Sequence, residues 1–119
     1  LSDYTEGRLE YHEAFSMVPA DAPTLAFTHN PDVFPDLSRA RFSLLIAGHT
    51  HGGQVKLPWL GRAVVPSKYG ERYAIGHVEE NHRHLFVTPG IGTSILPVRF
   101  GVPPEISYLR LQSTEGKTP

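Results

Sequence analysis

The 119-residue sequence contains no cysteine, so disulfides, thiolate metal sites and thiol nucleophiles are excluded. It also lacks any apolar run near the roughly 20 residues that a membrane-spanning helix needs. An excess of charge of one sign is missing too, because 11 Lys and Arg residues are balanced by 12 Asp and Glu residues. A surface so balanced produces no strong positive field, and non-specific nucleic-acid binding is therefore disfavoured.

The sequence is comparatively rich in histidine, glycine and proline, with 7, 11 and 11 residues. Glycine and proline are spread along the chain, which is typical of turns between short elements. The length fits one domain over residues 1–119, with a frayed tail over 112–119. Because the chain starts at Leu1 and no signal-like segment precedes the folded pattern, we expect a truncated or processed product.

Short apolar runs predict an α/β fold with a mixed sheet. Residues 24–28 and 42–47 are compact and apolar, as in buried strands. Residues 73–79 and 84–88 flank a polar turn and predict a β-hairpin, and alternation over 105–111 predicts a final strand. Two strand–loop units followed by antiparallel strands favour an α/β sandwich over a purely parallel array.

Two short helices are predicted, one before the first strand and one between the two buried strands. Tyr11, Ala14, Phe15 and Val18 fall at the spacing of one helical stripe, and prolines follow it. A second short helix is possible over 32–38.

Histidines follow both predicted buried strands. His29 comes just after the first, and His49 and His51 come just after the second with one residue between them. Functional groups in open α/β sheets gather beyond the carboxyl ends of the strands, and neutral imidazole is a common metal ligand. An extended His-x-His pair would point both rings to one side. A metal site is one interpretation; a lone histidine after a strand is more often an ordinary hydrogen-bonded residue.

The longer motif around these histidines is more specific. Gly48-His49-Thr50-His51 resembles the last conserved block of calcineurin-like metallophosphoesterases, and Thr28-His29-Asn30-Pro31-Asp32 resembles the lone-histidine block before it. The similarity extends over nearly the whole chain and is greatest to a bacterial branch with membrane-associated or exported phosphodiesterases. Further matching segments are 48–55, Leu57-Pro58, 66–70, Tyr73, 90–94, 97–100 and 104–106.

The resemblance implies the C-terminal half of an αββα sandwich and two divalent metal ions, Mn, Fe or Zn. His29 and His49 would bind one ion and His51 the other. The family's earlier blocks, an Asp-x-His, a Gly-Asp-x-x-Asp and a Gly-Asn-His-Asp/Glu, do not occur in these 119 residues. No complete catalytic set is therefore present.

The missing blocks matter because two closely spaced dications need bridging carboxylate charge, which three neutral imidazoles cannot supply. We expect this chain alone to hold at most one weakly bound ion, with Zn preferred to Mn, and to have no phosphoesterase turnover. The whole protein would be a hydrolase of phosphodiester, pyrophosphate or phosphomonoester bonds.

Two other side chains are candidates for substrate binding. Arg99 could hold a substrate phosphate or, equally, form a salt bridge that fixes its own loop. Tyr69, with Arg72 and Tyr73, could line a substrate cleft, although a solvated hairpin edge is the more ordinary interpretation. His77, His82 and His84 match no family block and are expected to be surface histidines.

The partners implied are a phosphorylated small-molecule or lipid-linked substrate and the N-terminal half of the domain. A homo-oligomer is expected, because uncovered sheet surface favours association. Peripheral membrane contact is a further possibility, with a location at the bacterial inner membrane or outside the cell favoured over the cytosol. The alternative hypothesis is a non-catalytic metal-binding or assembly module.

Overall fold

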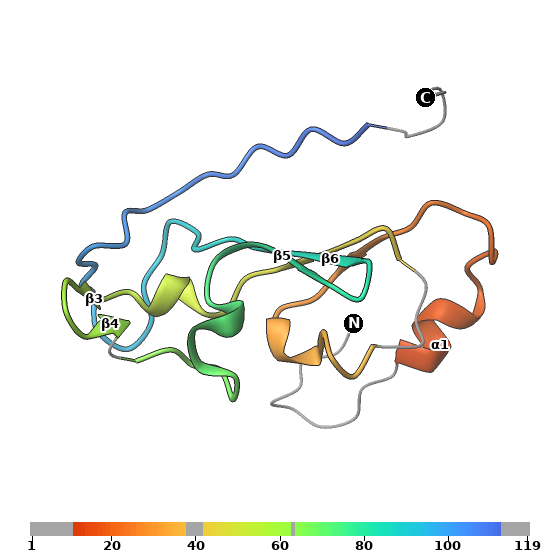
Figure 1. The fold of residues 1–119 in the computed structure, drawn as a ribbon. Helices are drawn as coiled ribbons and strands as arrows, with labels where there is room; N and C mark the ends of the chain where they lie inside the picture. The colour runs from red at the N-terminus through yellow and green to blue at the C-terminus, as the bar shows by residue number, and fades with distance from the viewer. Residues whose placement is uncertain (1–10, 38–41, 63, 113–119) are drawn as a thin grey trace.

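A mixed four-stranded sheet forms the centre of the computed structural model, which describes residues 11–37, 42–62 and 64–112 (Figure 1). The strand order is β1-β2-β6-β5. The first three strands are parallel, and β5 pairs antiparallel with β6. The strands are β1 (Leu25–Phe27), β2 (Leu44–Ala47), β5 (Gly76–Glu80) and β6 (Arg83–Val87). The α/β class, the strands β1 and β2 and the hairpin are confirmed, but β1 is buried only at Ala26, and the hairpin begins at Gly76 because Tyr73 lies in a 3-10 turn.

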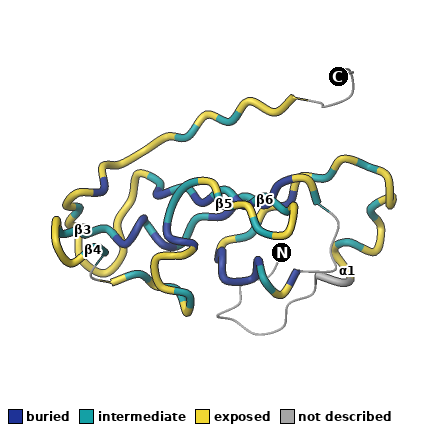
Figure 2. The backbone as a smooth tube through the Cα atoms, viewed as in Figure 1, coloured by how far each residue is buried: buried dark blue, intermediate teal, exposed yellow. Residues whose placement is uncertain are grey.

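One face of this sheet forms the core. Alternate residues of a strand point to opposite faces, and Leu45, Leu85 and Val87 are fully buried on the inner one. They pack with Phe34 and Tyr73, from two segments outside the sheet. The opposite face is partly open, and Phe27 is 62% exposed there. Figure 2 shows this division between buried and exposed backbone.

The helices are short: α1 precedes the first strand, and the three 3-10 turns lie between strands. The predicted helix over 11–18 is shorter than expected, and the one over 32–38 is replaced by a single 3-10 turn that Asn30 caps and Pro31 begins. Among the described residues, no helix is long and apolar enough to cross a membrane. The helical elements are α1 (Tyr11–Ser16), η2 (Pro31–Val33), η3 (His51–Gly53) and η4 (Gly70–Tyr73).

A small two-stranded sheet lies at one end of the molecule, where β3 (Lys56–Leu57) pairs with β4 (Gly61–Arg62) (Figure 1). The later loop 91–100 joins it. Val55 forms a parallel bridge with Phe100, and the Lys56 N–H donates to the Phe100 carbonyl at 2.7 Å. Two segments more than forty residues apart in sequence are thus held side by side.

The predicted strand over 105–111 is wrong. These residues run in an extended but irregular path across the sheet (Figure 1). A strand needs a hydrogen-bonded neighbour. Among the described residues, the one backbone hydrogen bond of this segment is that from the Glu105 N–H to the Gly90 carbonyl, at 2.9 Å. Most of the predicted tail over 112–119 lies outside the described residues.

Candidate metal site

His29 and His49 meet at the carboxyl ends of two adjacent strands. β1 and β2 are parallel and in register, so the residue two positions beyond each strand lies at the same edge of the sheet. The backbone reinforces this pairing beyond the strands, because the Gly48 N–H donates to the His29 carbonyl at 3.1 Å. Strand register therefore brings together histidines that are 20 residues apart.

The two rings approach within bonding distance. His29 Nε2 lies 2.9 Å from His49 Nδ1, and the rings are inclined at 66° with centroids 4.7 Å apart. Two nitrogens that bind one ion at about 2.0–2.1 Å stand about 2.9–3.4 Å apart, for bond angles from octahedral to tetrahedral. The pair thus has the spacing of two ligands of one ion, and without an ion one ring donates a hydrogen bond to the other.

The His-x-His segment is not extended, contrary to the prediction. His49 and His51 have φ values of 65° and 48°, in the left-handed region. This region is uncommon for residues with a side chain and often marks functional or tight-turn positions. The chain coils here because a 3-10 turn begins at His51, so the side-chain alternation of a strand does not describe this pair.

Thr50 anchors the segment between the two histidines. Its side chain is fully buried, and its hydroxyl donates to the Ala74 carbonyl at 2.6 Å. The same oxygen accepts from the Gly52 N–H at 3.4 Å. Because Thr50 faces the core, the histidines on either side of it are directed towards the surface.

Gly52 is needed where it stands. Its φ is +60°, and an added Cβ would lie 2.7 Å from Val102 Cγ1, closer than real atoms approach. The glycine allows the histidine turn to pack against the loop that carries Val102.

His51 lies beside the loop 90–92. A Cβ at Gly92 would be 4.0 Å from His51 Cε1. Burial lowers the pKa of His51, and the positive charge of Arg99 and then the two other histidines lower it further. The shift favours the neutral imidazole, which is the form that binds metals.

The donor set fits a metal centre in part. Neutral imidazoles suit Zn²⁺ and related ions. Within the ranges that the structure describes, however, no three His, Asp or Glu side chains converge closely enough to hold an ion. The chain provides two converging ligands and a third imidazole nearby, which is less than a closed four-ligand site requires.

Arg99 fixes its own loop. Its guanidinium donates to main-chain carbonyls of Pro89 at 2.6 Å, Gly90 at 3.0 Å and Gly92 at 2.5 Å. The geometry favours the loop-fixing interpretation, though through carbonyls in place of the expected salt bridge. The positive charge of Arg99 remains beside His51.

Tyr69 packs at the margin of the core. Its ring lies 5.1 Å from that of Tyr73, and the Tyr73 hydroxyl donates to Glu80 Oε2 at 3.0 Å. No described contact joins Tyr69 to His29, His49 or His51, and its role in substrate binding stays a prediction.

The hairpin histidines form a separate pair. His77 Nε2 lies 3.0 Å from His84 Nδ1, with the rings only 16° from parallel and centroids 5.2 Å apart. The separation of these two nitrogens is close to that of His29 and His49, but the His77 and His84 rings are stacked whereas the His29 and His49 rings are inclined. His82 is exposed in the hairpin turn.

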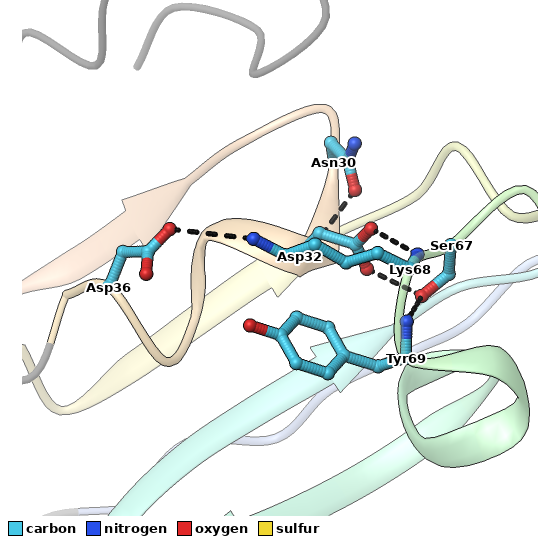
Figure 3. Close-up of polar contacts among 6 residues, drawn as sticks. All are labelled: Asn30, Asp32, Asp36, Ser67, Lys68 and Tyr69. Carbon is cyan, nitrogen blue, oxygen red and sulfur yellow. Dashed lines mark hydrogen bonds and ion pairs between the residues drawn. The ribbon is translucent and has the colours of Figure 1, made fainter.

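The sequence analysis missed the part that Asp32 plays (Figure 3). This carboxylate is buried and accepts from Ser67 Oγ at 2.5 Å and from the Lys68 N–H at 2.8 Å. Its own N–H donates to Asn30 Oδ1 at 2.9 Å. The network ties the turn after His29 to the loop 66–69. A signal was available, since Asp32 and Ser67 both lie in segments that match the family.

Comparison with curated proteins identifies relatives over nearly the whole chain. The metallophosphoesterase YkuE of Bacillus subtilis is 33% identical over 96% of the chain, and phosphodiesterase YaeI of Escherichia coli is 35% identical over 77%. UDP-2,3-diacylglucosamine pyrophosphatase LpxG of Chlamydia trachomatis is 29% identical over 92%. No family model and no solved structure matches the chain.

The sheet, the histidine pair at its edge and these relatives define a protein of metallophosphoesterase type. The chain is homologous to the calcineurin-like metallophosphoesterases and corresponds to a C-terminal portion of them. It spans 40% of the length of YkuE, 33% of YaeI and 35% of LpxG.

Proposed function

We propose that the whole protein is a binuclear metal-dependent phosphoesterase, in which His29 and His49 bind one ion and His51 binds the other. The observation that supports this most strongly is the 2.9 Å approach of His29 and His49 at the carboxyl edge of the sheet. The relatives named as phosphoesterases, phosphodiesterase and pyrophosphatase agree with it.

Within such a site, two bound ions would activate a water molecule and stabilise the charge of the leaving oxygen. The residues of this chain position and protect the ligands. Thr50 holds the turn that carries two of the histidines, Asp32 fixes the turn after the third, and burial lowers the pKa of His51, which favours its neutral form. Bridging carboxylates would have to come from other parts of the protein, so we expect no turnover from the 119-residue chain alone.

The substrate class follows from the relatives. A phosphodiester, pyrophosphate or phosphomonoester fits a two-metal site, and a lipid-linked substrate is included because LpxG is named for a diacylated sugar nucleotide. A location at the periphery of the inner membrane or outside the cell accompanies this proposal.

The metal assignment is tested by Zn²⁺ and Mn²⁺ titration of the chain in a calorimeter. We expect weak Zn²⁺ binding with about one ion per chain and weaker binding of Mn²⁺. His29→Gln and His49→Gln should each reduce the affinity at least tenfold, because each removes one of two converging ligands. His82→Gln is the matched control, since His82 is exposed far along the chain in the hairpin turn. Equal effects of all three substitutions would contradict the assignment.

The catalytic part requires a longer form of the protein that contains the Asp-x-His and Gly-Asn-His blocks. We expect it to hydrolyse a generic phosphodiester such as bis-p-nitrophenyl phosphate, and His49→Gln to abolish this activity. The alternative, a metal-binding module without catalysis, is favoured by the two-ligand geometry of the described residues. Metal binding by a longer form that hydrolyses none of the three phosphate ester types would select it.

A further inference from the structure

The loop 89–99 follows β6 and runs to the β3–β4 end of the molecule (Figure 1). Arg99, at the end of this loop, turns back onto its beginning. The guanidinium donates to the carbonyls of Pro89 at 2.6 Å and Gly90 at 3.0 Å, and to the Gly92 carbonyl twice, from Nε at 2.8 Å and from Nη2 at 2.5 Å. Two donors of one guanidinium therefore fix the Gly92 oxygen in place.

His51 meets the loop at the same residue. A Cβ on Gly92 would lie 4.0 Å from His51 Cε1, which is an ordinary contact distance. Burial and the positive charge of Arg99 lower the pKa of His51, whereas a hydrogen bond with the Gly92 main chain acts in the opposite direction. A hydrogen bond raises the pKa of an imidazole when a ring N–H is the donor, because that bond favours the protonated ring. The Gly92 carbonyl therefore accepts from both Arg99 and His51.

A hydrogen bond at one ring nitrogen of a histidine determines what the other nitrogen can do. Neutral imidazole carries its proton on either of its two nitrogens, and the nitrogen without the proton is the one that binds a metal. Metal-binding histidines commonly donate the remaining N–H to a carbonyl or carboxylate, which fixes the tautomer and the direction of the ring. The Gly92 carbonyl is placed to do this for His51.

We infer that Arg99 is a positioning residue: by fixing the Gly92 carbonyl, it holds the His51 ring in one tautomer and one orientation and leaves the other ring nitrogen for a metal ion. That an ion binds there rests on the proposed function, whereas the orientation of the ring does not. Arg99 then acts on the site without touching a substrate, because its donors are used on main-chain carbonyls.

Gln54 offers a matched comparison, because it holds the same loop at a different place. Its Nε2 donates to the Leu96 carbonyl at 3.0 Å and to the Val98 carbonyl at 3.2 Å, and its Oε1 accepts from the Ser94 N–H. These bonds all fall beyond the part of the loop that Arg99 holds. Loss of the Gln54 amide should therefore loosen the second half of the loop alone.

Nitrogen-15 NMR of the histidine rings tests the inference on the chain itself, in EDTA. The pH is held at about 8, where an ordinary imidazole with a pKa of about 6.5 is neutral. We expect the His51 ring in a single tautomer, with a ring N–H that exchanges slowly with water. His82, exposed in the hairpin turn, is the reference in the same spectrum, and its ring should show both tautomers and fast exchange.

Arg99→Lys removes the fork of donors but keeps a positive charge beside His51. We expect the His51 ring N–H to exchange severalfold faster and its tautomer ratio to approach that of His82, because its acceptor is no longer fixed. The ring signals of His29 and His49 should not move, since these two rings bond to each other. Urea denaturation shows whether the variant is folded.

Gln54→Ala is the control, and it should leave the His51 ring signals as they are in the original chain. An unchanged His51 ring in folded Arg99→Lys would overturn the inference. Equal changes in the two variants would also overturn it, because they would assign the effect to the mobility of the whole loop. A mixture of tautomers at His51 in the original chain, as at His82, would contradict the inference without any variant.

The consequence for metal binding is measured by titration of a longer form of the protein with Zn²⁺ and Mn²⁺. Arg99→Lys should lower the affinity for one of two ions about 10–100-fold and leave the affinity for the other unchanged, because it disturbs the partner of one ligand. Unchanged affinity for both ions would show that the ring is not positioned for a metal. A longer form that binds no second ion would contradict the proposed function instead, and the ring signals of the metal-free chain do not depend on that result.

Discussion

At the residue scale, Asp32 shows how a buried charge can position a site that it does not touch. Its carboxylate is hydrogen-bonded to Ser67 and Lys68 from the far loop, and its turn follows His29 directly. Burying a carboxylate is costly unless its oxygens accept hydrogen bonds, and here they do. The network therefore holds the His29 turn in one place.

Asp32→Asn should lower the free energy of unfolding by about 1–3 kcal/mol, because the amide leaves one of its two donors with a poor acceptor. Urea denaturation measures this. The control is Asp36→Asn, whose exposed ion pair with Lys68 at 3.8 Å is expected to contribute about 0–1 kcal/mol. If both substitutions have the same effect, the Asp32 network does not have the part assigned to it.

Tyr73 gives a pH dependence of stability. Burial raises the pKa of Tyr73 to about 12, with help from the hydrogen bond to Glu80. Because the folded pKa lies above the unfolded value of about 10, the folded state favours the protonated phenol. This contribution is complete below pH 10 and is lost as the pH rises from about 10 to about 12.

Urea denaturation at pH 8 and pH 11 checks the effect, with Tyr73→Phe as the comparison. The original chain should lose roughly 1–2 kcal/mol between these conditions through this residue. The variant should be less stable at pH 8 by about 1 kcal/mol for the lost hydrogen bond, and should show a smaller loss at pH 11. Equal losses in both proteins would exclude Tyr73 as the titrating group.

At the scale of the element, the histidine turn depends on close packing of η3. Gly52→Ala combines a left-handed backbone with a contact 2.7 Å from Val102, whereas Gly70→Ala has a similar φ of 59° but no atom within 4 Å. We expect a loss of about 1–2 kcal/mol at Gly70 from the backbone alone, and a clearly larger loss at Gly52. Thermal unfolding of the two variants gives the comparison; a Gly70 effect as large as that of Gly52 would contradict the packing argument.

The segment 105–111 has the alternation of a strand without a strand partner. Amide hydrogen exchange should therefore be slow in β2 and β6, which are paired on both sides, and fast over 106–111. Glu105 should be intermediate, since its N–H donates to Gly90. Slow exchange over 106–111 in the isolated chain would show a strand pairing that the described structure lacks.

At the scale of the whole molecule, the sheet is covered on one face only. Ala26, Leu45 and Leu85 are buried against the core, while Leu25 and Phe27 on the other face are exposed. An open apolar face and open sheet edges favour association. This supports the expectation of a homo-oligomer when the chain is studied alone.

Sedimentation velocity tests that expectation. The chain should associate with increasing concentration, and Phe27→Ser should shift the equilibrium towards the monomer, because it removes apolar area from the open face. A monomer at all concentrations would show that the open face does not associate.

The sequence by itself determined the α/β class, the two buried strands, the hairpin and the histidines that follow the strands. These features follow from local patterns: apolar runs, turn residues and a motif whose members are close in sequence. The metallophosphoesterase similarity was visible for the same reason, because its blocks are short and contiguous.

Only the tertiary structure decided how distant residues meet. Strand register places His29 beside His49. The buried Thr50 hydroxyl anchors a His-x-His segment that is coiled, whereas an extended segment was predicted. The Asp32 carboxylate is hydrogen-bonded to residues more than 30 positions away in sequence. Residues 106–111 have no backbone hydrogen bonds to a neighbouring strand among the described residues. Alternation of apolar residues describes one segment, whereas a strand also needs a second segment to pair with. Contacts between segments far apart in the chain depend on how the segments pack, and the residue pattern of either segment alone does not predict that packing.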